Sequence, residues 1–405
     1  MNADLVERRQ AGADAFATLG TPTEQLEHWK YVDLGFDPEQ IAAAPSGAEP
    51  LPADAVVSAV GTVHVRVVDG AVAAIDQADG ATISRFSEID HDHGALTDAL
   101  GAGMDPERDR LSAASRAHGS DGVLIHATKG QRSTVVVVVL AVAADVVSYP
   151  PLAGRVVPTA ELSLTVVYRS DDEFRAVVPR LDVSVGDAAR INLTTVQTWG
   201  AGTRATAHQR LVVGRDATAR IGEVGLGGAL GRLDLRVDLE GDGSSVDLDG
   251  LSFGDRDQTL DYRMLIRHAG KNTSSDIFLK GAVEDRASSV FTGLLRIEEG
   301  ATRTSAFETN RNLVLSDEAK AQSVPNLEIL CDDVVCGHGS SVGQLEDEPL
   351  YYLMSRGLPR DHAERVLVHG FFEEILDELP DSSVIDPVRE LVVGKFIAAQ
   401  AEGRL

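Results

Sequence analysis

A thiol and an imidazole lie two residues apart near the C-terminal end of the chain, at Cys336 and His338. Side chains two residues apart on an extended strand point to the same side, so a strand here presents both groups together. The second cysteine, Cys331, lies five residues before Cys336 and faces the opposite side of an unbroken strand. One thiolate and one imidazole suit zinc or an iron–sulfur centre, but they supply only half of its ligands. The spacing therefore predicts a metal site whose other ligands come from elsewhere.

The same residues have a simpler interpretation. Buried free cysteines are common and usually inert, and a complete zinc site shows four ligands at recognisable spacing. On spacing alone, Cys336 and His338 are therefore either half of a metal site or packed residues without a ligand role. Two further histidines, His91 and His93 in an acidic loop, are expected to be solvated, and His268 at a strand end is expected to be structural.

The elements that position this pair are predicted to be short strands. From residue 121 to 343, runs such as STVVVVVLAV, LSLTVVY and SVFTGLLRI follow one another between small and acidic corner residues. The third residues of four such corners, Ala287, Ala301, Ala319 and Val334, are spaced by 14, 18 and 15 positions. A loose repeat with few two-residue hairpin turns favours a parallel β-solenoid, although a Greek-key sandwich gives similar runs. The fold class is therefore predicted to be mainly β.

The patterns before, within and after this β-rich core divide the chain into three regions. Before the core, residues 63–75 alternate like a hairpin with Asp69 and Gly70 as its turn. Within the core, the apolar run 135–144 is expected to form a strand that is buried on both faces. The predicted regions are a mixed, partly helical N-terminal region (1–120), a parallel β-helix core (121–343) and a C-terminal helical region (344–405).

The C-terminal region carries apolar side chains at helical spacing. These helices either cap the open end of the solenoid or form a docking surface for a partner protein. Phe372 lies off the main apolar stripe of the second helix, which runs through Ala363, Val366, Leu367, Gly370, Phe371 and Ile375. The residues predicted to bind a partner are Leu350, Tyr351, Met354, Val366, Leu367, Phe371 and Phe372.

Composition limits the partners. The 405 residues include 63 acidic and 37 basic side chains, and the formal net charge of −26 argues against nucleic acid and anionic membranes. Such a surface suits a salt-rich cytoplasm, so a halophilic source is a hypothesis. The N-terminus shows no signal peptide, the longest apolar run is half a membrane span, and two cysteines give no disulfide framework. The chain is therefore expected to be cytoplasmic and not embedded in a membrane.

The sequence lacks the motifs of common enzymes. It contains no P-loop, no HExxH and no GxSxG with triad partners at suitable spacing. The glycine-rich stretch 225–228 is not followed by a βαβ unit and is expected to be a solenoid turn. We therefore expect a non-catalytic protein.

Two long stretches in the second half of the chain read FLKGAVEDRASSVFTGLLRIEEGATRTSAFETNRNLVLSDEAKAQSVP and NLEILCDDVVCGHGSSVGQLEDEPLYYLMSRGL, and a third near the N-terminus reads LGTPTEQLEHWKYVDL. On these stretches the chain resembles, from about residue 192 to 379, the SufB/SufD family of iron–sulfur cluster assembly proteins, and the third stretch resembles the N-terminal helical part of SufD. The resemblance implies a right-handed parallel β-helix core flanked by helical N- and C-terminal regions. It also implies a cytoplasmic complex of one SufB, one SufD and two copies of the SufC ATPase.

Within the family the chain resembles SufD more than SufB. Ala319 stands where SufB has a cluster-ligand cysteine, and Gly337 and Gly339 stand where SufB has acidic residues beside its histidine. The resemblance implies that His338 faces a SufB cysteine across the subunit interface, where a nascent cluster forms, and that the C-terminal helices dock SufC. The iron or iron–sulfur cluster is then transient and shared with SufB.

Several alternatives stay open at this point. Iron, a whole cluster or a reduced flavin could reach the site, and an isolated chain could pair its edge strands with a second copy. A SufB-like scaffold that holds a cluster alone needs more ligands than one Cys–His pair. A β-helix enzyme acting on polysaccharide is typically exported and needs clustered carboxylates or basic residues along the solenoid.

Overall fold

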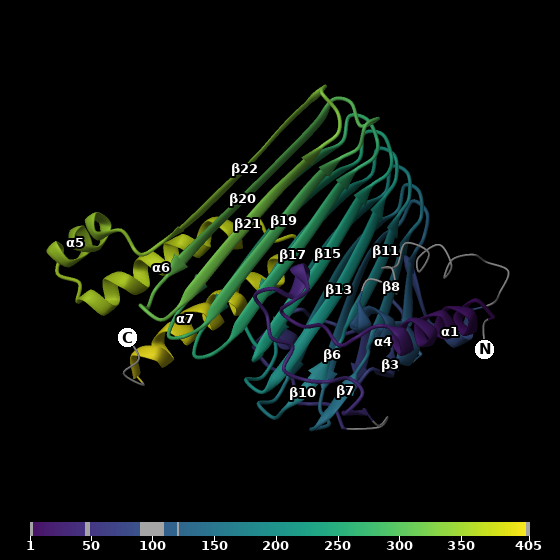
Figure 1. Cartoon of the computed structure of the whole chain (residues 1–405), viewed down its shortest axis with the longest axis horizontal. Helices are drawn as coiled ribbons and strands as arrows, with labels where there is room; N and C mark the ends of the chain where they lie inside the picture. Colours follow the sequence, from purple (N-terminus) through teal and green to yellow (C-terminus); the bar gives the residue numbers. More distant parts are fainter. Residues whose placement is uncertain (1–2, 45–48, 90–108, 120, 402–405) are drawn as a thin grey trace.

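A computed structural model of the chain describes residues 3–44, 49–89, 109–119 and 121–401. In this part of the molecule, two long β-sheets face each other and the chain passes from one to the other in successive coils (Figure 1). Each core strand pairs in parallel with the strand one coil further along the chain. The prediction of a mainly β parallel solenoid is confirmed, and the parallel pairing excludes a Greek-key sandwich, whose strands are antiparallel.

Eight coils are present in the described residues, and each gives one strand to each sheet. Sheet A consists, in spatial order, of β21 (Lys320–Ile329), β19 (Ser288–Ile297), β17 (Thr259–His268), β15 (Leu230–Leu239), β13 (Thr203–Val213), β11 (Arg180–Val185), β8 (Pro151–Val156), β5 (Val123–Ala127) and β4 (Ala81–Arg85), with β1 (Ala42–Ala43), β7 (Val146–Ser148) and β10 (Arg175–Val177) beside this path. Sheet B consists of β22 (Val334–Gly343), β20 (Thr304–Val314), β18 (Ser274–Val283), β16 (Ser245–Gly254), β14 (Thr218–Gly225), β12 (Arg190–Thr198), β9 (Glu161–Ser170), β6 (Arg132–Ala141), β2 (Val65–Val68) and β3 (Ala71–Ile75).

The corner repeat seen in the sequence corresponds to half a coil. In the last coils, Leu265 pairs with Leu294 and Ser288 pairs with Lys320, so one full coil takes 29 to 32 residues. Each of the 14- to 18-residue intervals therefore carries the chain through one strand and one corner, from one sheet to the other. The irregular interval reflects corners of different length between strands of similar length.

The core lies between the two sheets, and a second apolar layer covers the outside of sheet B. In β6, Val135, Val137 and Val139 face the interior, while Val136 and Val138 belong to the outer layer. All five side chains are at most 2% exposed. The predicted doubly buried strand is confirmed, although it ends at Ala141 rather than at residue 144.

The outer layer is made by the helices α6 (Arg360–Leu376) and α7 (Ile385–Ala401) and the short helices α2 (Ala55–Ala59) and η4 (Ser382–Val384), and α5 (Asp347–Ser355) packs against α6. Helices α6 and α7 pack on sheet B, where the rings of Phe253 and Phe372 stack at 6.1 Å between centroids. The predicted stripe on α6 was right in part, since Ala363 and Ile375 are buried. It was wrong for Val366, which is exposed, and it missed Val368 and Phe372, which are buried. Two adjacent apolar stripes run along this helix, and only the sheet decides which one is buried.

The N-terminal region is joined to the same solenoid. Residues 65–75 form the predicted hairpin, with Asp69 and Gly70 at φ of 50° and 83° in its turn. Besides α2, the helices among the described residues of this region are α1 (Ala3–Thr18), η1 (Glu27–Trp29), η2 (Phe86–Glu88) and α4 (Arg110–His118). Strands β2, β3 and β4 extend the two sheets, so the described N-terminal residues continue the core, and the boundary at residue 120 stays a prediction.

A buried carboxylic acid lies in the solenoid interior. Glu223 in β14 is 2% exposed, and one of its oxygens accepts a hydrogen bond from the hydroxyl of Thr195. Burial raises its pKa to about 8, far above that of an exposed glutamate, because a charge between two apolar sheets loses its hydration. The folded protein therefore holds this proton at neutral pH.

This buried acid should make stability fall as pH rises. Between the ordinary glutamate pKa and about 8, the unfolded chain has lost the Glu223 proton and the folded chain retains it. Its contribution to the free energy of unfolding should therefore decline by about 1.4 kcal/mol per pH unit in this window and stay constant above it. Urea unfolding at pH 5 to 9 should show a shallower decline for Glu223→Gln than for the wild type. An unchanged slope for Glu223→Gln, with the exposed Glu299→Gln as control, would contradict this prediction.

Candidate functional site

The candidate site lies at the open end of the solenoid. Strand β21 pairs only with β19 and strand β22 only with β20, so both sheets end in an unpaired edge among the described residues. Figure 1 shows β22 as the outermost strand, remote from the N-terminal helices. The two last strands are connected by a short turn at residues 330–333.

This turn decides where the two cysteines lie. Cys331 lies within it, is 9% exposed and packs into the solenoid interior. Cys336 is the third residue of β22 and packs against the same core from a half-buried position. The expectation that the cysteines face opposite sides was wrong, because it assumed an unbroken strand. Cys331 is thus a core residue and Cys336 stays at the border of the core.

His338 belongs to the same row of β22 as Cys336. In the parallel ladder, Cys336 pairs with Ala306 and His338 pairs with Glu308, and both partners on β20 are buried. This row faces the interior in earlier coils, but no further coil covers β22, so His338 is exposed. It has no hydrogen bond or ion pair with other described residues. An exposed imidazole in a row that no further coil covers can bind a metal ion together with ligands from a partner chain.

Glu308 was missed from the sequence and lies directly beside His338. It is 2% exposed, burial raises its pKa to about 7, and its Oε1 has no hydrogen-bond partner. Its carboxyl reaches across the interior to Gly293 on sheet A, where a Cβ would collide with it. The alternation of Ala306, Glu308 and Asn310 along one face of β20 is the sequence signal that places this acid inside.

The pair cannot complete a metal site by itself. Within the described ranges, no group of three or more His, Cys, Asp or Glu side chains is close enough to hold a metal ion. Cys336 and His338 therefore offer at most two ligands, whereas zinc and iron–sulfur centres take four. The chemistry of the two groups fits a shared site and does not fit a self-contained one.

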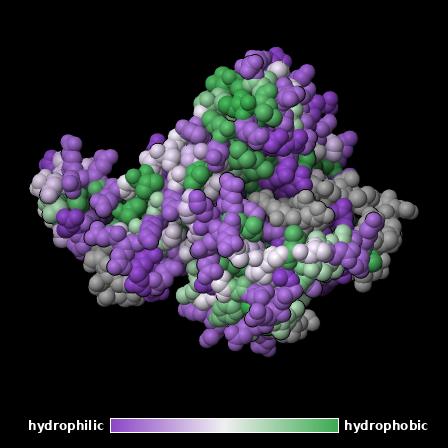
Figure 2. All heavy atoms as spheres, in the orientation of Figure 1, coloured by the Kyte–Doolittle hydropathy of each residue, from purple (hydrophilic) through white to green (hydrophobic). Residues whose placement is uncertain are grey.

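The edge beside the pair is suited to pairing with another strand. Strand β22 has no proline and no acidic or basic residue other than His338, so it lacks the usual protection of an edge strand. Val335, at 65% exposure, and the exposed Ile329 and Leu330 surround the turn that precedes β22. Figure 2 shows hydrophobic side chains gathered at the top of the molecule, where β21 passes into β22 in Figure 1. Such an apolar edge is typical of an interface.

The predicted partner-binding residues divide into two groups. Leu350 and Phe372 are at most 2% exposed and belong to this chain's own core. The other five lie at the surface of α5 and α6, and Tyr351 is 61% exposed. The adjacent Tyr352 is also exposed, at 57%. The exposed or half-exposed residues of this surface are Tyr351, Tyr352, Met354, Val366, Leu367 and Phe371.

The remaining histidines do not join the site. His268 is buried, and its ring nitrogens lie 2.8 Å from the hydroxyl of Thr273 and 3.0 Å from that of Ser275. Burial lowers its pKa to about 4, so it is a neutral structural residue, as predicted. His91 and His93 lie outside the described residues.

The fold and the site together define a class of protein: a parallel β-solenoid that ends in free strand edges with an incomplete Cys–His site. None of its described helices is long and apolar enough to cross a membrane. The family model described as "SUF system FeS cluster assembly, SufBD core domain" matches residues 140–371, more than half of the chain. The chain therefore belongs to the SufBD family of iron–sulfur cluster assembly proteins.

Relatives of known name agree with this assignment. An iron–sulfur cluster assembly SufBD family protein of Mycobacterium tuberculosis is 37% identical over 241 residues, which cover 58% of this chain and 60% of that protein. SufD of Escherichia coli is 27% identical over 380 residues, covering 90% of this chain and 87% of that protein. SufD of Bacillus subtilis is 40% identical over 148 residues, 36% of this chain and 34% of that protein. The chain spans about three fifths of the mycobacterial relative, and it is SufD-like by sequence similarity.

Proposed function

We propose that this chain is the SufD-like subunit of a SUF scaffold complex, in which it pairs with SufB, docks the SufC ATPase and contributes His338 to a nascent cluster site. The observation that carries the proposal is the exposed His338 in an unfinished interior row, next to an edge without protecting charges. Similarity to proteins named SufD supports the choice of partners.

A shared site is needed because Cys336 and His338 supply at most two of the four ligands of an iron–sulfur centre. A strand of SufB added to β22 places its side chains beside Cys336 and His338, because strands that pair lie about 4.8 Å apart. His338 binds iron through a neutral imidazole nitrogen, and SufB supplies the thiolate and the remaining ligands. The cluster is cargo that forms at this interface and then leaves. Cys336 is a second candidate ligand. It is half-buried and lies two residues before His338 in the same row of β22.

The C-terminal helices are the proposed docking surface for SufC. Tyr351 and Val366 are exposed on α5 and α6, and aromatic residues are frequent at the centres of interfaces. Helix α6 is also packed on sheet B, so a force applied by SufC reaches the solenoid through a rigid contact. ATP-driven dimerisation of two SufC subunits then moves this chain and SufB relative to each other and reshapes the shared site. This chain itself performs no catalysis, and it works in the cytoplasm, where its two free cysteines stay reduced.

The composition of the complex tests the proposal. Anaerobic mixing with SufB and SufC from the same organism, followed by size-exclusion chromatography with light scattering, should give one species with one copy of this chain, one SufB and two SufC. The double variant Tyr351→Ala with Val366→Ala should keep SufB and lose its SufC, because both side chains are exposed in the unbound chain. A chain that binds neither protein would refute the proposal.

A further inference from the structure

A buried carboxyl without a partner lies in the interior of the last complete coil. Glu308 is 2% exposed, its Oε1 has no hydrogen bond, and it forms no ion pair with other described residues. Such a group lowers stability, because burial removes its hydration and nothing in the unbound chain replaces it. Buried polar atoms without a partner are rare in folded proteins and need an explanation. Glu308 therefore has room for a hydrogen bond that the unbound chain does not make.

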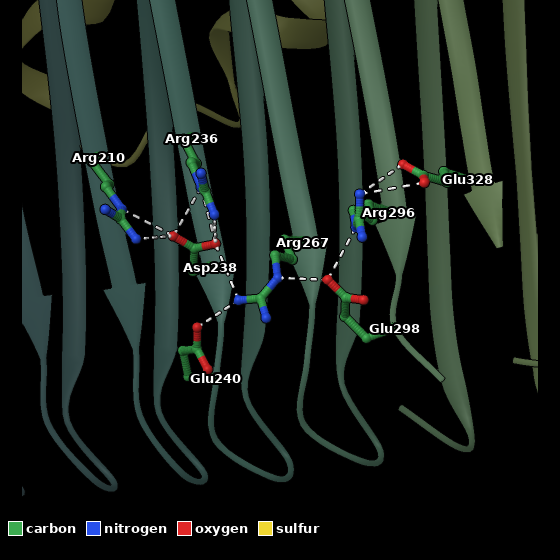
Figure 3. A network of polar contacts seen from close by, with 8 residues as sticks. All are labelled: Arg210, Arg236, Asp238, Glu240, Arg267, Arg296, Glu298 and Glu328. Carbon is green, nitrogen blue, oxygen red and sulfur yellow. Dashed lines mark hydrogen bonds and ion pairs between the residues drawn. The ribbon is translucent and has the colours of Figure 1, made fainter. Parts of the chain in front are cut away.

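The acids on the outer face of sheet A are bound differently. Figure 3 shows a ladder in which guanidinium groups from successive strands point toward the carboxylates. Each of these carboxylates lies 2.6 to 3.1 Å from an arginine nitrogen. The ladder ends where Arg296 on β19 binds Glu328 on the edge strand β21. The chain thus pairs the acids of this outer face with arginines and leaves the buried Glu308 without a cation.

Sheet A leaves space across the interior from Glu308 and His338. The carboxyl of Glu308 extends to Gly293 on β19, where a Cβ would lie 2.1 Å from Oε2. Gly293 pairs with Pro325 on the edge strand β21. Glu308 pairs with His338 on β22 in the same way, so the same arrangement one coil further places His338 across from Pro325. A glycine and a proline on sheet A therefore face two long polar side chains on sheet B.

The imidazole of His338 is the nearest polar neighbour in the row of Glu308. Paired strands lie about 4.8 Å apart, and paired side chains of a parallel ladder point to the same face. In the unbound chain the imidazole is exposed and has no hydrogen bond with other described residues. A further strand on β22 covers this row and confines the imidazole to the interior side, where Glu308 lies beside it.

We propose that Glu308 is a positioning residue for His338: its Oε1 accepts a hydrogen bond from one ring nitrogen of His338 and leaves the other nitrogen to bind iron. A neutral imidazole carries its proton on one nitrogen, and the hydrogen bond made there decides which nitrogen is free for a metal. A carboxyl group keeps an acceptor oxygen whether or not it is ionised, so the hydrogen bond needs no change of charge. This inference rests on the proposed function, because it concerns how His338 binds iron at the SufB interface.

Iron binding by variants of the complex tests this role. The probe is Fe(II), added anaerobically to the purified complex with SufB and SufC, and equilibrium dialysis measures its dissociation constant. Glu308→Met keeps the length of the side chain but removes the acceptor, and it should weaken iron binding about 10- to 100-fold. Glu308→Gln keeps an acceptor oxygen and should retain most of the affinity. In a complex that already carries His338→Ala, Glu308→Met should cause no further loss, because Glu308 acts through His338.

Two controls separate positioning from a loss of stability. Glu223→Met removes a buried acid from β14, three coils away from β20, and should leave iron binding unchanged. Urea unfolding should show that Glu308→Met is at least as stable as the wild type, because it removes a buried polar group without a partner.

The outcomes distinguish this role from the proposed function. Wild-type iron affinity of the Glu308→Met complex, or an equal loss with and without His338, would overturn the positioning role and leave His338 as a ligand. Wild-type iron affinity of the His338→Ala complex would overturn both.

Discussion

Replacing His338 with alanine should reduce cluster formation by the complex with SufB and SufC at least about tenfold. Loss of a residue that only orients a metal ligand already costs about 10- to 100-fold in affinity, so loss of a ligand should cost no less. The folded chain should be unaffected, because His338 is exposed and has no hydrogen bond or ion pair with other described residues. Anaerobic reconstitution with iron and sulfide, followed by absorption spectroscopy and iron analysis of the purified complex, measures the effect.

Two further variants serve as a control and as a test of the second candidate ligand. His362→Ala removes another exposed histidine, on α6 and away from the β22 edge, and should leave cluster yield unchanged. Cys336→Ser distinguishes a ligand from a packed neighbour, because a half-buried neighbour can be replaced without loss of cluster. Wild-type cluster yield on an intact His338→Ala complex would remove His338 from the site.

Replacing Arg232 with alanine should lower the free energy of unfolding by about 3–5 kcal/mol. Arg232 in β15 is 2% exposed, forms an ion pair with the buried Asp261, and donates from Nη2 to the carbonyl of His28 at 2.8 Å. Its guanidinium also lies 4.0 Å from the ring centroid of Trp29, which packs as the anchor of the N-terminal segment. Removing it leaves the Asp261 carboxyl buried without its partner, and burial raises the pKa of that group. Urea unfolding measures the loss.

A compensating variant separates the buried charge from lost packing. Arg232→Met with Asp261→Leu removes both charged groups and should recover most of the lost stability, since a buried ion pair often contributes little over well-packed apolar residues. Arg204→Ala serves as the control, because Arg204 donates to the carbonyls of Asp33 and Leu34 without a buried acid beneath it. Equal losses for Arg204→Ala and Arg232→Ala would contradict the role of the buried pair.

The sequence by itself determined the features that depend on short spacing. Cys336 and His338 share a row because they are two residues apart on a strand, and Asp69 and Gly70 form a hairpin turn because of their own backbone preferences. The corner intervals predicted a solenoid because each strand and its corner are local units. The family resemblance rested on similarly continuous stretches.

Tertiary structure alone decided which residues meet between coils. Glu308 lies beside His338 because β20 and β22 pair in a register of 30 residues, and corner lengths vary too much for spacing to predict that number. The turn at residues 330–333 placed Cys331 in the core, and packing against sheet B buried Phe372 and left Val366 exposed. Strand register and helix orientation are set by hydrogen bonds and apolar contacts between distant segments, so no local pattern contains them.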